Sequence, residues 1–154
     1  MAKFRSFILL LVFAFAAFSQ EPSAPPPAFQ NVGTMSQLMV NMIYPASDAI
    51  FYVERAPPKN DHDWGGLQYQ ALVLAESANL LMMPGRARDQ DKWIKDAKLM
   101  LEVGAAAYKA TKAKDLDAVI AVSDALNTAC IQCHQDYRPA YRRRLPAKEP
   151  EKKE

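Results

Sequence analysis

Apolar residues recur at every third or fourth position along four stretches of the chain, which is the spacing of one face of an α-helix. The stretches run from about residue 34 to 56, from 64 to 83, from 89 to 108 and from 115 to 138. No stretch alternates apolar and polar residues for long enough to predict a strand. Helices of roughly 20 residues, each about 30 Å long and joined by short loops, predict an all-α fold, an antiparallel up-down-up-down four-helix bundle.

Two of the predicted helices have internal features that affect packing. Pro45 interrupts the first helix, and because its ring removes a backbone hydrogen bond and clashes with the preceding turn, we expect a kink or a restart there. In the third helix, Gly104 and the three alanines after it form a slim surface that permits close approach of another helix. Four polar residues of the third helix are expected to face water: Lys92, Lys95, Asp96 and Lys98.

The first 19 residues have the form of a secretory signal peptide. Lys3 and Arg5 precede an apolar run from Phe7 to Phe18, which is too short to span a bilayer, and small and polar residues follow. We expect cleavage after Ser19, export to the periplasm and no stable membrane insertion of the processed protein. The alternative is an uncleaved membrane anchor.

The processed chain is long enough for one domain with one core. We assign residues 20–32 to a proline-rich leader, residues 33–140 to the domain, and residues 141–154 to a charged tail that is expected to be disordered. Loss of Lys3 and Arg5 leaves 17 basic and 17 acidic residues, so the processed protein is formally neutral. Nucleic acid is therefore not expected as a partner.

The motif Cys130-Ile131-Gln132-Cys133-His134, near the end of the fourth helix, has the spacing of a c-type haem attachment site. On a helix, residues at i, i+3 and i+4 share one face. The two thiols can then add to the two vinyl groups on one edge of the porphyrin, and His134 can bind the iron. This interpretation predicts one covalent haem c for the chain.

Two other chemistries use the same residue types. A thioredoxin-like redox pair would normally follow a strand and open a helix, whereas this pair lies near the end of a long helical run. A zinc site would need a fourth ligand besides Cys130, Cys133 and His134. The only other histidine, His62, is predicted in a loop about 30 Å away at the opposite end of the bundle, exposed to solvent. Both cysteines lie in the motif, so no structural disulfide is expected.

Methionines of the first helix are candidates for a sixth iron ligand, because a thioether is a known axial ligand of haem iron. Met39 is the first choice, followed by Met35 and Met42. The alternative is a vacant, apolar distal pocket lined by the same side chains. The topology predicts three further residues at this end of the bundle: Met82, Met83 and Trp93.

Arg138 lies four residues after His134, on the same predicted helix face. We expect it to pair with a haem propionate or to hydrogen-bond near the imidazole. The alternative is a solvated cation that offsets the helix dipole. Three further arginines, Arg142, Arg143 and Arg144, are expected to be solvated, with docking of a partner as the alternative.

The segment from Cys130 to Arg138 resembles the C-x-x-C-H-x-x-[aromatic]-Arg pattern of the cytochrome c-prime family, the class II c-type cytochromes. Ordinary class I cytochromes c carry the motif near the N-terminus, whereas here it lies late in the chain. The resemblance covers roughly residues 33 to 140. It implies thioether bonds at Cys130 and Cys133 and a proximal ligand at His134.

The resemblance also bears on the other candidate residues. Arg138 corresponds to the basic residue beside the proximal pocket of the family, and Gln37-Leu38-Met39 resembles the first-helix segment that supplies methionine in low-spin members. High-spin members have an apolar residue facing an empty sixth position. Homodimers formed through the first two helices are common in the family, so a homodimer is implied here.

Electron transfer ranks first among the functions that these observations predict: a periplasmic carrier with His134 and a methionine on the iron, and a redox protein as its partner. Gas binding ranks second, with a five-coordinate haem that captures nitric oxide or carbon monoxide in an apolar pocket. We expect no enzymatic activity, because neither a distal histidine nor a catalytic acid–base pair is predicted at the haem end.

Overall fold

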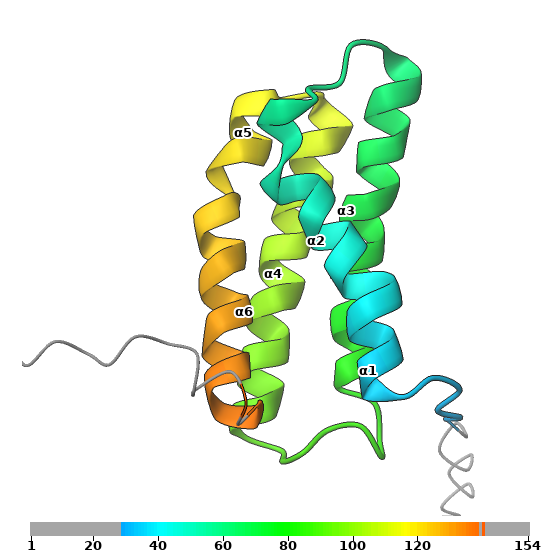
Figure 1. Ribbon diagram of the computed structural model, residues 1–154, viewed down its shortest axis with the longest axis vertical. Helices are drawn as coiled ribbons and strands as arrows, with labels where there is room; N and C mark the ends of the chain where they lie inside the picture. The colour runs from blue at the N-terminus through cyan, green and yellow to red at the C-terminus, as the bar shows by residue number, and fades with distance from the viewer. Residues whose placement is uncertain (1–28, 139, 141–154) are drawn as a thin grey trace, which may run out of the picture.

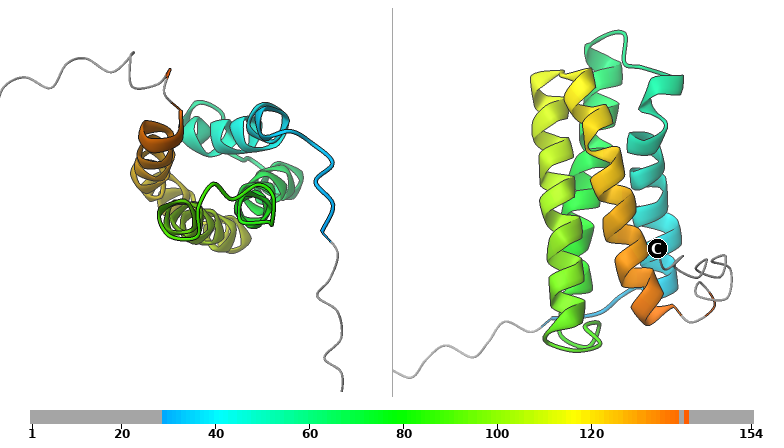
Figure 2. Two further views of the ribbon diagram at one scale, coloured as in Figure 1. Left: turned by 90° about the horizontal axis from the view of Figure 1, so that it is seen from below. Right: turned by 90° about the vertical axis from the view of Figure 1, so that its left-hand side faces the viewer.

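The computed structural model describes residues 29–138 and 140. The predicted signal peptide, residues 20–28 of the leader, and the tail with its three arginines lie outside the described residues. Within the described part of the chain the fold is all-helical and contains no strand. The helices pack as a bundle around one apolar core, as Figures 1 and 2 show.

The four predicted helical stretches are present, and two of them are built from several segments. The first consists of α1 (Met35–Leu38), a π-helical turn η1 (Met39–Ile43) and α2 (Tyr44–Phe51), followed by the short 3-10 helix η2 (Val53–Arg55). The second and third are single helices, α3 (Asp61–Leu81) and α4 (Lys92–Ala113). The fourth consists of α5 (Leu116–Ala121) and α6 (Ser123–Tyr137), with a single residue, Val122, between them.

The π-helical turn explains how the first helix accommodates Pro45. The Tyr44 N–H donates to the Met39 carbonyl, five residues back, so the turn is one residue wider than an α-helical turn. Pro45 then falls in the first turn of α2, where its missing N–H costs least. The interruption predicted at Pro45 is thus a change of helix type just before the proline, and the chain stays helical through it.

One end of the bundle collects the segments that matter for the candidate site. Figure 1 shows the start of α1, the loop between α3 and α4, and the end of α6 together at the lower end. The loop that connects η2 to α3 lies at the opposite end. His62 belongs to the first turn of α3 at that opposite end and is exposed, so it is exposed as predicted but lies in the helix and not in a loop.

By length and composition alone, the continuous run Leu116–Tyr137 could also cross a membrane. Mostly buried core helices of proteins in water pass the same test, but in this structure only 17% of the apolar window is buried, although α6 packs against α4. One such helix is by itself weak evidence for insertion.

Gly104 allows α3 and α4 to pack more closely than a side chain would permit. A Cβ atom placed on Gly104 would lie 2.8 Å from the backbone N and from the Cα of Ala75. Ala107, one turn further on, is fully buried, whereas Ala105 and Ala106 are exposed. The slim surface predicted in the third helix is therefore confirmed at Gly104 and Ala107.

Replacing Gly104 by alanine is expected to destabilise the protein, although alanine is the better helix former. The new Cβ would overlap the Ala75 backbone, and overpacking of this kind costs about 1–3 kcal/mol of unfolding free energy, against roughly 1 kcal/mol gained in helix propensity. Gly66→Ala is the matched control, because Gly66 lies inside α3 with nothing within 4 Å of its Cβ position. Denaturation followed by circular dichroism should give a lower midpoint for Gly104→Ala and an equal or higher midpoint for Gly66→Ala. A raised midpoint for Gly104→Ala would show that the two helices are not so closely packed.

Candidate haem site

The three motif side chains lie on one face of α6 and line two neighbouring cavities that share part of their lining. Cys130, Cys133 and His134 are all half-buried. Cys133 and His134 line a cavity of about 290 Å³, here the outer cavity. A smaller cavity of about 40 Å³, here the inner cavity, is lined by the same two residues and by Cys130. The helical spacing thus presents both thiols and the imidazole to one side, as predicted.

Four segments of the chain enclose these cavities. Both cavities touch Met39 of the first helix, and the inner cavity also touches Leu81 at the end of α3. The outer cavity is lined by Met35, Ser36, Met39, Val40, Arg88, Trp93, Cys133, His134, Tyr137 and Arg138. The inner cavity is lined by Met39, Ile43, Leu81, Asp96, Ala97, Met100, Ala129, Cys130, Cys133 and His134. Apart from the motif residues, Asp96 is therefore the one polar side chain in the lining of the inner cavity.

The structure separates the candidate methionines by position. Met39, the first residue of the π-helical turn, lines both cavities, and Met35 lines the outer one. Met42 lies elsewhere, in a surface hollow shared with Met83. Met82 lines neither cavity, while Trp93 lines the outer one, as predicted. Met39 is thus the methionine that shares the most space with His134.

Two arginines border the outer cavity. Arg138, the residue at which α6 ends, is exposed and lines this cavity together with His134. Arg88, in the loop before α4, lines the same cavity and was not identified from the sequence. The predicted topology was the one signal for it, because that loop had to lie at the haem end. Both guanidinium groups are placed where they could meet carboxylates at the cavity mouth.

Burial keeps the motif side chains in their uncharged forms. It raises the pKa of the Cys130 thiol, and together with the Asp96 carboxylate and weaker neighbours it raises the pKa of Cys133 to about 11. Burial, followed by the charge of Arg138, lowers the pKa of His134 below its usual value. Near neutral pH the thiols are therefore protonated and the imidazole is neutral, which is the form that binds a metal.

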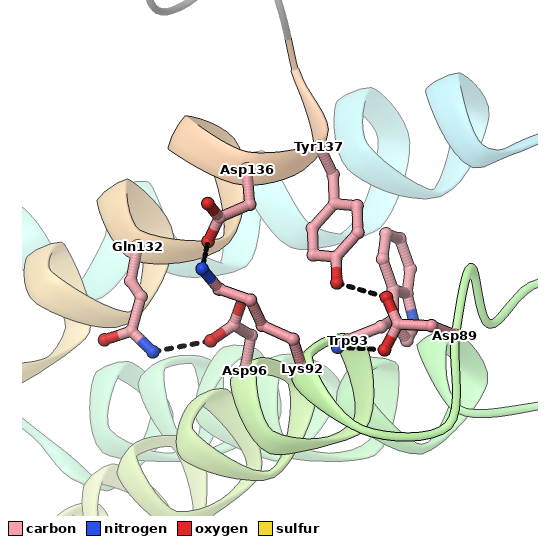
Figure 3. A network of polar contacts seen from close by, with 7 residues as sticks. All are labelled: Asp89, Lys92, Trp93, Asp96, Gln132, Asp136 and Tyr137. Carbon is pink, nitrogen blue, oxygen red and sulfur yellow. Dashed lines mark hydrogen bonds and ion pairs between the residues drawn. The ribbon is translucent and has the colours of Figure 1, made fainter.

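A polar and aromatic contact fastens the end of α6 to the start of α4, as Figure 3 shows. The Tyr137 hydroxyl donates a short hydrogen bond to Asp89, and the Trp93 backbone N–H donates to the other carboxylate oxygen of Asp89 at 2.9 Å. The Tyr137 ring meets the Trp93 ring edge-on, with centroids 4.9 Å apart. The hydrogen bond between Tyr137 and Asp89 raises the pKa of the phenol and lowers that of the carboxyl, so the proton stays on Tyr137.

Two further contacts join the same helices beside the motif. Lys92 Nζ lies 2.8 Å from Asp136 Oδ2, and Gln132 Nε2 donates to Asp96 Oδ1 at 2.5 Å. Gln132, inside the motif, lies four residues before Asp136, so one helix face carries both links. These contacts hold the rotation of α6 about its own axis, and with it the direction of the motif side chains.

The prediction that Asp96 faces water is wrong. Its side chain is buried, with 1% of the residue exposed. Because α4 packs against both α3 and α6, its buried face is wider than one apolar stripe. Asp96 lies three residues after Trp93 and four before Met100, both buried, and this spacing was the signal that could have located it.

The part of the chain that the structure describes, the motif included, holds no ready-made cluster of metal ligands. Among residues 29–138 and 140, no group of three or more histidine, cysteine or acidic side chains is arranged to hold a metal ion. His62 lies at the opposite end of the bundle from the motif and so does not join Cys130, Cys133 and His134.

Comparison with known proteins gives no relative from which a role could be transferred. No protein-family model, no curated protein and no solved structure matches the chain.

Proposed function

We propose that the protein is an exported c-type cytochrome that binds one haem covalently through Cys130 and Cys133, with His134 as an iron ligand. The observation that carries this proposal is the placement of two half-buried thiols and an imidazole on one face of α6, lining cavities that Met39 borders from the first helix. The proposal includes an antiparallel up-down-up-down order of the four helices and the resemblance to the cytochrome c-prime family.

The ionisation of the thiols supports haem attachment over a thiol–disulfide catalyst. Such a catalyst needs a thiolate, which a position at a helix N-terminus favours by lowering the thiol pKa. Here the pair lies in the last turns of α6, and burial raises the pKa of both thiols. Protonated thiols on the inner side of a helix suit addition to a vinyl group and do not suit rapid disulfide exchange.

The packing of α6 supports an apolar cofactor beside it. Of the residues in α6, only Leu126 and Ala129 are buried by the rest of the described chain. Cys130, Cys133 and Met39 are half-buried around the cavities. A flat apolar group held at the motif would cover these side chains and gain about 25 cal/mol for each Å² of apolar surface removed from water.

The distribution of charge supports one orientation of the cofactor. Arg88 and Arg138 border the outer cavity, whereas the inner cavity has no cationic side chain among its lining residues. The two haem propionates would therefore lie toward the outer cavity, where the guanidinium groups can pair with them. Arg138 then has the propionate role predicted for it, and Arg88 shares it.

Electron transfer is the function that this site supports best. Bound haem would supply a one-electron couple. The chain would fix the position of that couple through two covalent bonds and His134, and Ile43, Leu81 and Met100 around the inner cavity would exclude water. Met39 would complete the ligation, and a thioether ligand raises the reduction potential. The carrier would work in the periplasm with a redox protein as partner.

Binding of nitric oxide or carbon monoxide is the second candidate. The observation that favours it is the apolar lining of the inner cavity, which suits a small neutral ligand better than a charged one. In this case Met39 would border the ligand and would not bind the iron. The two candidates differ in one measurable property, the sixth ligand.

Removing one cysteine at a time tests the attachment. Cys130→Ala and Cys133→Ala should each keep haem through one remaining thioether bond, and the double variant should lose all covalent haem. Each lost thioether leaves a vinyl group, which shifts the pyridine haemochrome band to longer wavelength. Thr128→Ala, an exposed change on the same helix, should leave the spectrum unchanged. Covalent haem that persists in the double variant would refute attachment at these residues.

The sixth ligand is tested with optical spectra of the oxidised and reduced protein, with and without carbon monoxide. Electron transfer predicts a low-spin spectrum that carbon monoxide does not change, and a high-spin, carbon monoxide-binding spectrum for Met39→Ala. Met42→Ala is the matched control, because Met42 lines neither cavity and should leave the spectrum low-spin. A high-spin unmodified protein that binds carbon monoxide at once would exclude methionine ligation and make gas binding the better candidate.

A further inference from the structure

Asp96 is a buried carboxylate with one oxygen that has no protein partner. Only 1% of the residue is exposed, and Oδ1 accepts a hydrogen bond from Gln132 Nε2 at 2.5 Å. Oδ2 is buried and has no hydrogen-bond partner among the residues that the structure describes. Burial of such an oxygen destabilises the fold, and an apolar residue of similar volume is often neutral or stabilising at such a position. Stability therefore does not explain an aspartate here.

The surroundings of Asp96 leave its negative charge without a cation in the same cavity. It lines the inner cavity with Met39, Met100 and the motif residues. No lysine or arginine is among the residues that line this cavity. Lys92 pairs with Asp136, and the two arginines of the site line the outer cavity.

The position of Asp96 relative to the motif is fixed. Gln132, its hydrogen-bond donor, lies between Cys130 and Cys133 on α6. Any group bonded to these cysteines is thus held at a set distance from the carboxylate. The carboxylate also lines the same cavity as Cys130 and Cys133.

We propose that Asp96 sets the reduction potential of the site: it is a fixed, buried negative charge that favours ferric over ferrous iron. Ferric haem carries one more positive charge than ferrous haem, and a nearby carboxylate in a low-dielectric interior stabilises that extra charge. Asp96 thereby lowers the potential, in opposition to a thioether ligand, which raises it. This inference rests on the proposed haem attachment and adds the residue that tunes it.

The test is a redox titration of the haem-loaded protein with three variants. Asp96→Asn and Asp96→Leu both remove the charge, and Asp91→Asn removes an exposed carboxylate near the start of the same helix. Both Asp96 variants should raise the ratio of ferrous to ferric protein roughly tenfold at a fixed applied potential, which is an upward shift of about 59 mV for one electron. Asp91→Asn should change the ratio far less.

The salt dependence of the shift in reduction potential distinguishes a buried charge from a surface charge. The Debye length falls from about 30 Å at 0.01 M to about 3 Å at 1 M ionic strength, yet buried pairs are screened much less than exposed ones. The shift caused by Asp96→Asn should therefore persist at high salt, and any shift caused by Asp91→Asn should disappear. A shift for Asp96→Asn that vanishes with salt would overturn the proposal.

Three further outcomes would overturn the proposal, and a fourth would refute the proposed function. Unchanged potentials in both Asp96 variants, with covalent haem and an unchanged spin state, would show that Asp96 does not tune the site. Opposite shifts for asparagine and leucine would assign the effect to packing and would equally overturn the proposal. If neither variant acquires haem while Asp91→Asn does, Asp96 serves assembly and the proposal is wrong. If the unmodified protein acquires no covalent haem, the proposed function itself fails, which is a separate result.

Discussion

The contact between the last turns of α6 and the first turns of α4 determines where the candidate site lies. The Tyr137 ring packs edge-on against Trp93, and its hydroxyl donates a hydrogen bond to Asp89. On the same pair of helices, Gln132 donates a hydrogen bond to Asp96. One of these links comes from within the motif and the other from just after it along α6. They fix the rotation of the helix, so the thiols and the imidazole point into the bundle. The residues that would hold the haem and the residues that pack α6 against α4 thus lie at the same end of α6.

The other wall of the site depends on the π-helical turn of the first helix. This turn begins at Met39 and ends directly before the turn that holds Pro45. The wider turn lets the helix continue past a proline, and it sets which side chains face α6. Turns of this kind occur often at functional sites. In this protein Met39, which lines both cavities, is the first residue of that turn.

The sequence predicted the helices and the motif well, because both depend on local spacing. Residues at i, i+3 and i+4 share a helix face whatever the tertiary packing, so Cys130, Cys133 and His134 were placed together correctly. Asp96 was missed because its burial depends on α4 having two neighbours, which no single-helix pattern shows. Arg88 was missed because a loop residue has no periodicity. The outcome at Pro45 depended on a π-helical turn for which the chain offers no simple sequence signal.

Whether the motif residues hold haem by covalent bonds can be measured by intact mass under denaturing conditions. The protein would be produced with its N-terminal segment in a bacterial host that attaches c-type haem, then purified and unfolded before measurement. Covalent attachment at Cys130 and Cys133 predicts the mass of the processed polypeptide plus one haem. The mass of the polypeptide alone, or that mass lowered by the hydrogens lost in a disulfide between Cys130 and Cys133, would contradict it.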